Sequence, residues 1–395
     1  MSFHCGCDEK VWRRLVLNRR ALLRTGVSAA TIAVAGPGLL QSAVAQSATP
    51  AASPAPGHTV TSRGVVNGTS FLNPLVEVYG NVEIGERCYV AGNTILLASE
   101  NLRLRLGNEN NCQDNAYLLA QADNLIFGDM VSIAHHAVIE NSTIGDFTFF
   151  GFRCRVRSAV IEEGAMVLHQ SLVENVTIPA NRLVPVGAQI TTQEQADALE
   201  ELEEANEEFK HEVQSVNLEF AEGYIALFEE VGLEALTGVG PNPITSWNPA
   251  PVEPTLGANV ELAELVRVVG DVDLGAESRV GQRTSIRADE GTPIVIGRRA
   301  RIGSRVTFHA LKGTSVEVGE NAIIGDGNVV HGPVTIGANF TSEDDCVVFQ
   351  ATIEDNVLVR EGATIAGQCT IREGSIVPER AVILTQEDAD ALAVI

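Results

Sequence analysis

Aliphatic residues followed by glycine recur at regular intervals in the C-terminal part of the chain. The pairs are Ile296-Gly297, Ile302-Gly303, Val318-Gly319 and Ile324-Gly325. The first two are six residues apart, and so are the last two. Gly303 and Gly319 are 16 positions apart, which equals two six-residue steps plus an insertion of four. A fixed short period indicates a repeat protein whose units stack on one another. Three six-residue steps form one triangular coil of a left-handed parallel β-helix, so the pattern predicts this fold for residues 257–384, here called copy 2.

The same pattern appears, less regularly, in residues 71–190, here called copy 1. Its aliphatic or aromatic residues before glycine include Ile84-Gly85, Leu106-Gly107, Phe127-Gly128 and Ile144-Gly145. The chain has 36 glycines and only 5% aromatic residues, which suits short strands joined by many turns. We therefore expect an all-β protein of two left-handed parallel β-helices, produced by tandem duplication.

Residues 191–236 change to the period of an α-helix. Apolar residues there recur at intervals of three, four and seven, at Leu199, Leu202, Phe209, Val213, Val216 and Phe220. The residues between them are strongly acidic, so we expect one long helical segment with a solvated acidic face. Residues 237–256 contain five prolines and are predicted to be a linker, and 385–395 a C-terminal tail.

The N-terminal residues 1–45 have the pattern of a targeting segment. Asn18-Arg19-Arg20 resembles a twin-arginine signal, and Ala43-Val44-Ala45 a cleavage site after a mildly apolar stretch. A short membrane anchor is the alternative. We expect export to the periplasm or cell surface, a flexible linker over 46–70, and no membrane span once the signal is removed.

The net charge argues against nucleic acid and anionic membranes as partners, and the cysteines argue against a disulfide-stabilised fold. The net charge of −24 repels nucleic acid and anionic membranes. After the leader the chain has five dispersed cysteines, an odd number that does not form a disulfide framework. We expect them to be small buried residues of the coils.

The repeat places two histidines of copy 2 at equivalent positions of successive coils. His331 follows His309 by 22 positions, which equals three six-residue steps plus an insertion of four, or one coil. The two rings should therefore stack on adjacent strands, roughly 4.8 Å apart. That separation suits two imidazoles on one metal ion. Arg287 lies another 22 positions upstream and joins the same column.

Three motifs around these residues resemble the γ-class carbonic anhydrases, namely Ser285-Ile286-Arg287-Ala288-Asp289-Glu290-Gly291, Thr307-Phe308-His309-Ala310 and Val329-Val330-His331-Gly332-Pro333. The resemblance covers nearly all of 71–236 and 257–384. It implies β-helices that associate so that each active site lies between neighbours, with two histidines from one and a third from the next. It also implies reversible hydration of CO2 to bicarbonate by metal-hydroxide attack, with Zn²⁺, or Fe²⁺ or Co²⁺, as cofactor.

Neither copy carries the full motif set, and the losses are complementary. Copy 2 has Asp326 where the family has its third histidine, and Gly303-Ser304 where it has a Gln-Asp pair. Copy 1 keeps the pair as Gln113-Asp114 and the histidine as His135, but has Leu119 and Glu140 at the other two histidine positions. We therefore predict one complete site per chain, built between copy 1 and copy 2.

The resemblance assigns a role to each residue of this site. His309, His331 and His135 are the metal ligands; Gln113 and Asn217 orient the hydroxide or bicarbonate; Glu290 is the proton acceptor. Arg287 pairs with Asp114 or Asp289 across the interface in a structural role. His136 and His169 are expected to have no part in the site.

Other interpretations stay open at this stage. The chain could be a non-catalytic binding or assembly protein related to these anhydrases, or, with less support, a hexapeptide acyltransferase. Asp326 could be a third ligand in a site of copy 2 alone. The copies could pair within one chain or within a homo-oligomer.

Overall fold

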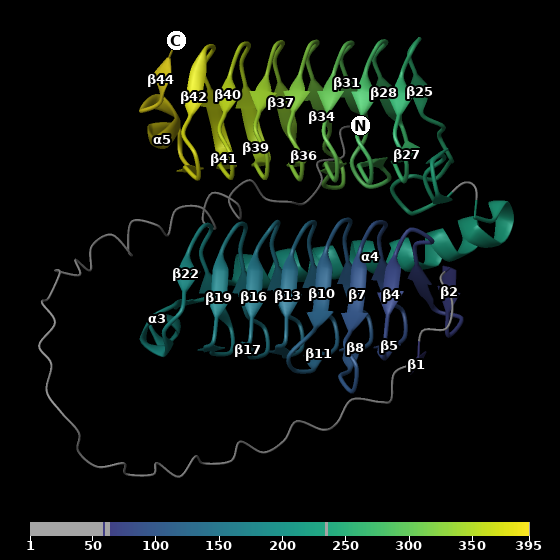
Figure 1. The fold of residues 1–395 in the computed structure, drawn as a ribbon, viewed down its shortest axis with the longest axis vertical. Helices are drawn as coiled ribbons and strands as arrows, with labels where there is room; N and C mark the ends of the chain where they lie inside the picture. The colour runs from purple at the N-terminus through teal and green to yellow at the C-terminus, as the bar shows by residue number, and fades with distance from the viewer. Residues whose placement is uncertain (1–57, 60–63, 234–235, 395) are drawn as a thin grey trace, which may run out of the picture.

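The computed structural model describes residues 58–59, 64–233 and 236–394, so the predicted signal segment 1–45 lies outside the described residues. Two left-handed parallel β-helices lie side by side, with the first coil of each at the same end of the molecule (Figure 1). The helix α4 (Glu204–Val231) runs along copy 1 and leads to copy 2. The all-β class expected from the hexapeptide period, with one long helix between the copies, is confirmed.

Copy 1 consists of three sheets, one for each side of the triangular coil. The first sheet contains β1 (His58–Thr59), β5 (Val82–Ile84), β8 (Leu104–Leu106), β11 (Leu125–Phe127), β14 (Thr143–Ile144), β17 (Val160–Ile161) and β20 (Thr177–Ile178). The second contains β4 (Glu77–Tyr79), β7 (Ile95–Ala98), β10 (Tyr117–Ala120), β13 (Val138–Glu140), β16 (Arg155–Arg157), β19 (Leu172–Glu174) and β22 (Gln189–Ile190). The third contains β2 (Gly64–Val66), β3 (Ser70–Leu72), β6 (Tyr89–Val90), β9 (Asn111–Cys112), β12 (Ser132–Ile133), β15 (Phe149–Phe150), β18 (Met166–Val167), β21 (Arg182–Val184) and β23 (Glu200–Glu201).

Copy 2 has the same three sides, two of which are joined into one sheet by the long strands β39 (Val347–Ile353) and β41 (Thr364–Ile371). The side that faces copy 1 contains β24 (Val239–Gly240), β27 (Arg267–Gly270), β30 (Ser285–Ala288), β33 (Thr307–Ala310), β36 (Val329–Gly332) and β43 (Val382–Ile383). The second side, which β39 and β41 join to the first, contains β25 (Thr255–Leu256), β28 (Val272–Leu274), β31 (Ile294–Ile296), β34 (Val316–Val318) and β37 (Val334–Ile336). The remaining sheet contains β26 (Glu261–Leu262), β29 (Arg279–Val280), β32 (Arg301–Ile302), β35 (Ile323–Ile324), β38 (Thr341–Ser342), β40 (Leu358–Val359), β42 (Ser375–Val377) and β44 (Ala393–Val394).

Period-two alternation within the short strands places the apolar residues inside each coil. In β28 the side chains of Val272 and Leu274 are buried and that of Asp273 is exposed, because successive side chains of a strand point to opposite faces. Corners between strands are occupied by residues with left-handed backbone, such as Asn93 (φ 58°) and Asn115 (φ 60°). Asparagine tolerates this conformation better than most residues. The five cysteines of the described residues are free and buried, as the sequence predicted.

Secondary structure extends beyond the predicted β-helix boundaries at both ends of each copy. Strands β2 and β3 form an antiparallel hairpin within the segment expected to be a linker through residue 70. A three-residue loop, Asn67 to Thr69, joins the strands, since Val66 pairs with Ser70. Asn67 and Gly68 in this loop have positive φ, a conformation that asparagine and glycine tolerate. Strands β24 and β25 lie in the predicted linker 237–256, because each adds to the open edge of the first coil of copy 2.

The C-terminal ends of both copies close in the same way. The helix α3 (Gln193–Asp197) begins after the N-cap Thr192, and α5 (Gln386–Asp390) after the N-cap Thr385. Each is followed by an antiparallel strand, β23 or β44, on the last coil. Residues 385–394 of the predicted tail are therefore a cap of copy 2, since they repeat the cap of copy 1.

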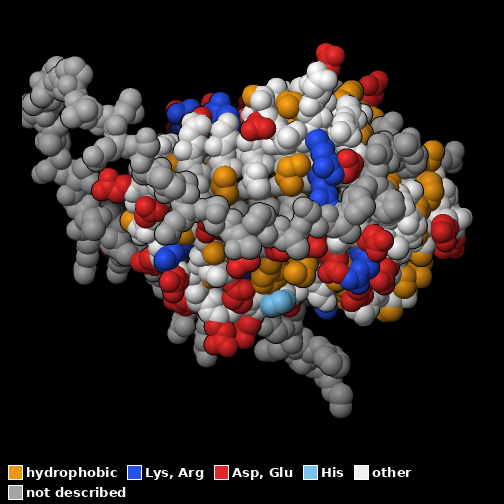
Figure 2. Space-filling model, turned by 90° about the horizontal axis from the view of Figure 1, so that it is seen from below, with side chains coloured by type: hydrophobic (Ala, Val, Ile, Leu, Met, Phe, Trp, Pro, Cys, Tyr) orange, Lys and Arg blue, Asp and Glu red, His pale blue; other side chains and the backbone are white. Residues whose placement is uncertain are grey.

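The two copies are joined by a shared apolar core. It contains residues from both β-helices and from α4, namely Ala134, Phe149, Phe152, Met166, Leu168, Leu183, Val186, Phe209, Val329, Val347, Phe349, Ala366 and Leu384. In this structure, copy 1 and copy 2 of the same chain therefore pack against each other. Acidic side chains are spread over the face seen in Figure 2. None of the helices in the described ranges combines the length and apolar character needed to cross a membrane.

Candidate metal centre

His309 and His331 stack on adjacent strands, as the repeat arithmetic predicted. They are direct neighbours in the parallel register of β33 and β36. His309 Nδ1 lies 3.2 Å from His331 Nε2, and both side chains are buried. One nitrogen of each ring therefore faces the other ring at a distance that a shared ion could bridge.

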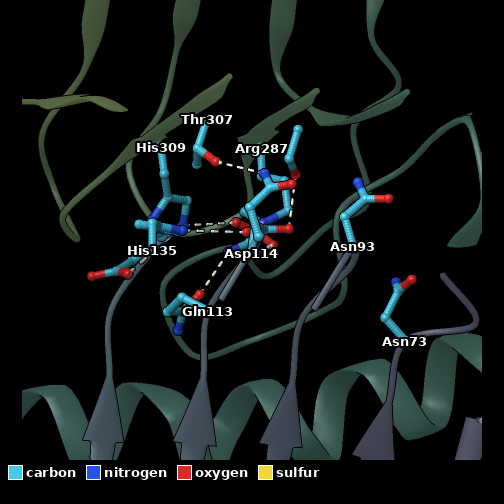
Figure 3. Close-up of polar contacts among 12 residues, drawn as sticks. Asn73, Asn93, Gln113, Asp114, His135, Arg287, Thr307 and His309 are labelled. Carbon is cyan, nitrogen blue, oxygen red and sulfur yellow. Dashed lines mark hydrogen bonds and ion pairs between the residues drawn. The ribbon is translucent and has the colours of Figure 1, made fainter. Parts of the chain in front are cut away.

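His135 approaches this pair from the other copy. It follows β12 at a corner of copy 1 and is 1% exposed. The ring centroid of His135 lies 5.2 Å from that of His309 and 5.6 Å from that of His331. One ligand nitrogen from each of the three histidines lies within 4.8 Å of the others. Figure 3 shows His135 and His309 pointing toward one another from opposite β-helices.

The second ring nitrogen of each histidine faces an oxygen. His309 Nε2 lies 3.1 Å from Asp289 Oδ1, and His331 Nδ1 lies 3.1 Å from the carbonyl oxygen of Gly332. His135 Nδ1 lies 3.5 Å from Asp114 Oδ2. In metal sites a ligand histidine usually donates its other N–H to a carboxylate or carbonyl, which fixes the ring and its tautomer. His309 and His331 have this arrangement, whereas His135 Nδ1 lies beside Asp114 without a hydrogen bond to it. Three buried imidazoles, two of them fixed at the second nitrogen, form a donor set that fits a divalent metal.

The electrostatics of the centre favour neutral imidazoles. Burial holds the pKa of His135 well below its ordinary value, and the neighbouring histidines lower it further. Burial likewise lowers the pKa of His331. Neutral imidazole is the form that binds metal ions.

Arg287 lies at the middle of a buried polar network between the copies. Its Nε donates to Asp114 Oδ2 at 2.8 Å and its Nη2 to Gln113 Oε1 at 2.8 Å. Its Nη1 bonds Asp289. Burial alone would raise the pKa of Asp289, but Arg287 and the contact with His309 hold it well below its usual range. Arg287 thus connects the carboxylate beside His135 to the carboxylate beside His309.

The residues expected to handle the reactants lie around the same centre. Gln113 Nε2 of copy 1 donates to Asn217 Oδ1 of α4 at 2.7 Å. This hydrogen bond fixes the side-chain amide of Gln113. Glu290 Oε2 lies 3.9 Å from His309 Nε2, and Glu290 Oε1 accepts from the backbone N–H of Lys312 at 2.8 Å. Burial raises the pKa of Glu290.

A cavity of about 60 Å³ opens directly onto the three histidines. Polar groups line one part of it and apolar side chains of both β-helices and α4 line the rest, with Phe149, Phe152, Phe209, Val213, Val216 and Leu311 among them. Its volume suits a molecule of a few atoms. The three histidines, Gln113, Asn217 and Glu290 all border it.

Several residues of the site were not predicted. Tyr224 donates to Asp289, and Trp247 Nε1 and Asn248 Nδ2 donate to the Asp289 carbonyl oxygen at 2.9 and 2.7 Å. Phe152 lies between the rings of His331, at 4.8 Å, and His169, at 4.5 Å. Trp247 and Asn248 belong to the proline-rich segment 237–256, which was predicted to be a linker and is here called the connection. Nothing in its local sequence signals a contact with the site.

Two histidines expected to have no part are buried near it. His136 Nε2 lies 3.0 Å from Thr307 Oγ1, so this residue belongs to the interface between the copies. His169 Nδ1 accepts from the backbone N–H of Phe152 at 3.0 Å, and burial lowers its pKa to about 3. Neither residue belongs to the histidine cluster or borders the cavity, in line with the expectation that they have no part in the site; their burial was not predicted.

The residues that replace family histidines do not reach the centre. The carboxylate of Asp326 is exposed and accepts from the backbone N–H of Ser304 at 2.7 Å. Leu119 and Glu140 pair in register on β10 and β13, outside the set that borders the cavity. The alternative in which Asp326 is the third ligand is therefore not supported.

Comparison with known proteins gives homologues named as carbonic anhydrases and as carboxysome assembly proteins, although no family model matches the sequence. A carbonic anhydrase of Methanosarcina thermophila is 28% identical over 43% of this chain and 78% of its own. The carboxysome assembly protein CcmM of Nostoc sp. is 29% identical over 44% of this chain. The mitochondrial gamma carbonic anhydrase 1 of Arabidopsis thaliana is 30% identical over 30% of this chain.

This chain spans about a third of the length of the CcmM protein, 34%, and 46% of the plant protein. A solved hexapeptide transferase family protein from Anaplasma phagocytophilum is 22% identical over 42% of this chain and 95% of its own, with a TM-score of 0.29. The chain is a homologue of the γ-class carbonic anhydrases, and it carries their hexapeptide-repeat β-helix in two tandem copies.

Proposed function

We propose that this protein is a metal-dependent carbonic anhydrase with one active site per chain, which hydrates CO2 reversibly to bicarbonate. The observation that carries the proposal is the convergence of three buried histidines from both copies within 4.8 Å. His309 and His331 have the second nitrogen at hydrogen-bond distance from an oxygen, and His135 Nδ1 lies 3.5 Å from Asp114 Oδ2. A three-histidine set leaves one position of a tetrahedral ion open, which is the pattern of catalytic zinc sites.

The metal would be held by His135, His309 and His331, with Zn²⁺ as the expected ion and Fe²⁺ or Co²⁺ as alternatives. A divalent ion in such a site lowers the pKa of water to about 7 and so supplies hydroxide for attack on CO2. The carboxylate of Asp289 orients the His309 ring, and that of Asp114 lies beside His135. Arg287 fixes both carboxylates from its buried position.

The remaining residues bind and orient the reactants. Gln113 and Asn217 each use one amide hydrogen within the protein, and an amide nitrogen carries two, so a second stays available for an oxygen in the cavity. Glu290 borders the cavity with one carboxylate oxygen held by the Lys312 backbone, which leaves the other to accept a proton. The apolar wall excludes bulk water and accommodates CO2.

Metal content and CO2 hydration together test this proposal. The full-length protein, purified without chelators, should contain one divalent metal per chain and accelerate CO2 hydration in a stopped-flow pH-indicator assay. His331→Ala should lose both properties. One metal per chain without any hydration after loading with Zn²⁺, Fe²⁺ and Co²⁺ in turn would contradict the catalytic proposal and leave a metal-binding one.

An assembly function is the second candidate, because the CcmM relatives are named as assembly proteins. It requires no metal, so a folded protein without stoichiometric metal under all loading conditions would favour it. We further propose that the protein acts in the periplasm or at the cell surface, on the basis of the twin-arginine pattern in residues 18–24. Replacement of Arg19 and Arg20 by lysine should retain the protein in the cytoplasm.

A further inference from the structure

A second arginine is buried near Arg287, and unlike Arg287 it has no hydrogen-bonding partner in the described part of the chain. Arg267 begins β27 and pairs in register with Ser285, on the side of copy 2 that faces copy 1. It is 1% exposed. Its Nε, Nη1 and Nη2 are all buried without a partner among the described residues. A protonated guanidinium has five N–H donors, so the whole donor group is unsatisfied.

The environment of Arg267 accounts for one face of its guanidinium only. The guanidinium carbon lies 4.9 Å from the ring centroid of Tyr224, a cation–π contact. Tyr224 is part of an aromatic cluster with Phe71 and Tyr89. Stacking satisfies the face of the planar group, whereas the N–H donors lie at its edge. Burial of an ion without charge-assisted hydrogen bonds is strongly unfavourable.

The nearby carboxylates are already used. Asp114 accepts from Ser285 with Oδ1 and from Arg287 with Oδ2. Asp289 faces His309 with Oδ1 and accepts from Arg287 and Tyr224 with Oδ2. The contrast is internal to the site, since Arg287 has carboxylate or oxygen partners on each of its three nitrogens.

We propose that Arg267 forms the binding site of a small monovalent anion, separate from the metal centre. The planar edge of a guanidinium matches a planar oxyanion such as bicarbonate or formate, and it also binds a halide. A single negative charge is favoured because Asp114 and Asp289 repel a more highly charged ion. The site is connected to the metal centre through Tyr224, whose hydroxyl bonds the carboxylate that faces His309.

The experiment uses metal-free full-length protein, so that anions cannot bind to a metal. Crystals soaked in bromide should show an anomalous peak at the edge of the Arg267 guanidinium, and formate-soaked crystals should show a planar density there. Bicarbonate should displace the bromide if an oxyanion is the natural occupant. Ordered water alone at Nε and both Nη atoms, or a carboxylate of the chain in contact with them, would overturn the proposal.

Thermal unfolding gives a second measurement in solution. Bromide should raise the melting temperature by about 2–4 °C relative to gluconate at the same ionic strength. Arg267→Met should remove this response, and Arg267→Lys, which keeps the charge on a more flexible stem, should retain part of it. The exposed Arg155 on β16 provides the control, since Arg155→Met should respond like the wild type. An equal response of wild type and Arg267→Met would contradict the proposal, whatever the outcome of the hydration assay.

Discussion

At the scale of single residues, the centre is defined by how each histidine is held rather than by the histidines alone. Asp289 and the Gly332 carbonyl fix the rings of His309 and His331, and Asp114 lies beside His135. An imidazole fixed at one nitrogen presents the other in a single direction. The rings are therefore organised for an ion before any ion is bound, which limits the conformational entropy lost on binding.

Removal of one ligand histidine should abolish metal retention. His135→Ala, His309→Ala and His331→Ala each leave only two imidazoles, which is too few for a stable zinc site. The metal content of purified variants, measured by inductively coupled plasma mass spectrometry, should fall to background in all three. His136→Ala is the matched control, because its ring contacts Thr307 and not the centre. Loss of metal from His136→Ala with intact ligands would mean that the register of this corner has been misassigned.

The buried ion pair of Arg287 should be important for stability. Asp114→Ala removes one carboxylate from a fully buried arginine, and breaking a buried pair from one side costs about 3–5 kcal/mol. Urea denaturation should show this loss in the free energy of unfolding. Glu320→Ala breaks the solvent-accessible pairs with Arg298 and Arg299 and should change stability little. A similar small effect from Asp114→Ala would show that water enters the network.

Residue chemistry was predictable from the sequence where it follows the repeat. The stacking of His309 on His331 follows from counting positions, and the part of His135 follows from the complementary motifs. Trp247, Asn248 and Phe152 were not predictable, because they reach the site through packing of segments that no period relates. The same limit applies to His136 and His169, whose corners are buried only because the two copies lie against each other.

At the scale of elements, α4 and the connection after it close the site from one side. Asn217 of α4 bonds Gln113, and Tyr224, about two turns further along the helix, bonds Asp289. The connection packs on this helix, where Glu219 accepts from the backbone and hydroxyl of Ser246. The sequence predicted this helix from its apolar period, but composition alone gave no reason to place the proline-rich connection against the metal centre.

At Gly223 the connection lies close against α4. A Cβ at this residue would lie 2.9 Å from the carbonyl oxygen of Ile244 and 3.1 Å from Pro243. Gly223→Ala favours an isolated helix by about 1 kcal/mol, yet here it should displace the connection and with it the Asp289 contacts of Trp247 and Asn248. We expect lower stability and weaker metal binding, measured by urea denaturation and by competition with a chelator.

The neighbouring Glu222→Ala provides the control for this helix. Glu222 is exposed on α4, so its replacement should change the free energy of unfolding by less than about 0.5 kcal/mol. If Gly223→Ala stabilised the protein and left metal affinity unchanged, the connection would have room to move, and its contacts with Asp289 would not position the centre.

At the scale of the whole molecule, duplication has made the two sides of the site different. Copy 2 supplies His309 and His331 and copy 1 supplies His135, while the positions that would build a second centre hold Leu119, Glu140 and Asp326. A shared apolar core and the network of Arg287 hold the complementary sides together within one chain. The sequence predicted the complementary loss but left open whether the copies pair within a chain or between chains, since repeat patterns carry no information on that choice.

Pairing within one chain can be tested by mixing two defective chains. Coexpression of full-length His135→Ala with full-length His331→Ala, each with a different affinity tag, places an intact His135 and an intact His309–His331 pair in the same cell but on different chains. Because each chain buries its own copy 1 against its own copy 2, neither chain can complete the other, and the purified mixture should contain no metal above the level of either variant alone. Two wild-type chains with the same tags serve as the control for expression and loading. Metal approaching one ion for every two chains in the mixture would show instead that the copies exchange between chains, so that the native site forms in an oligomer.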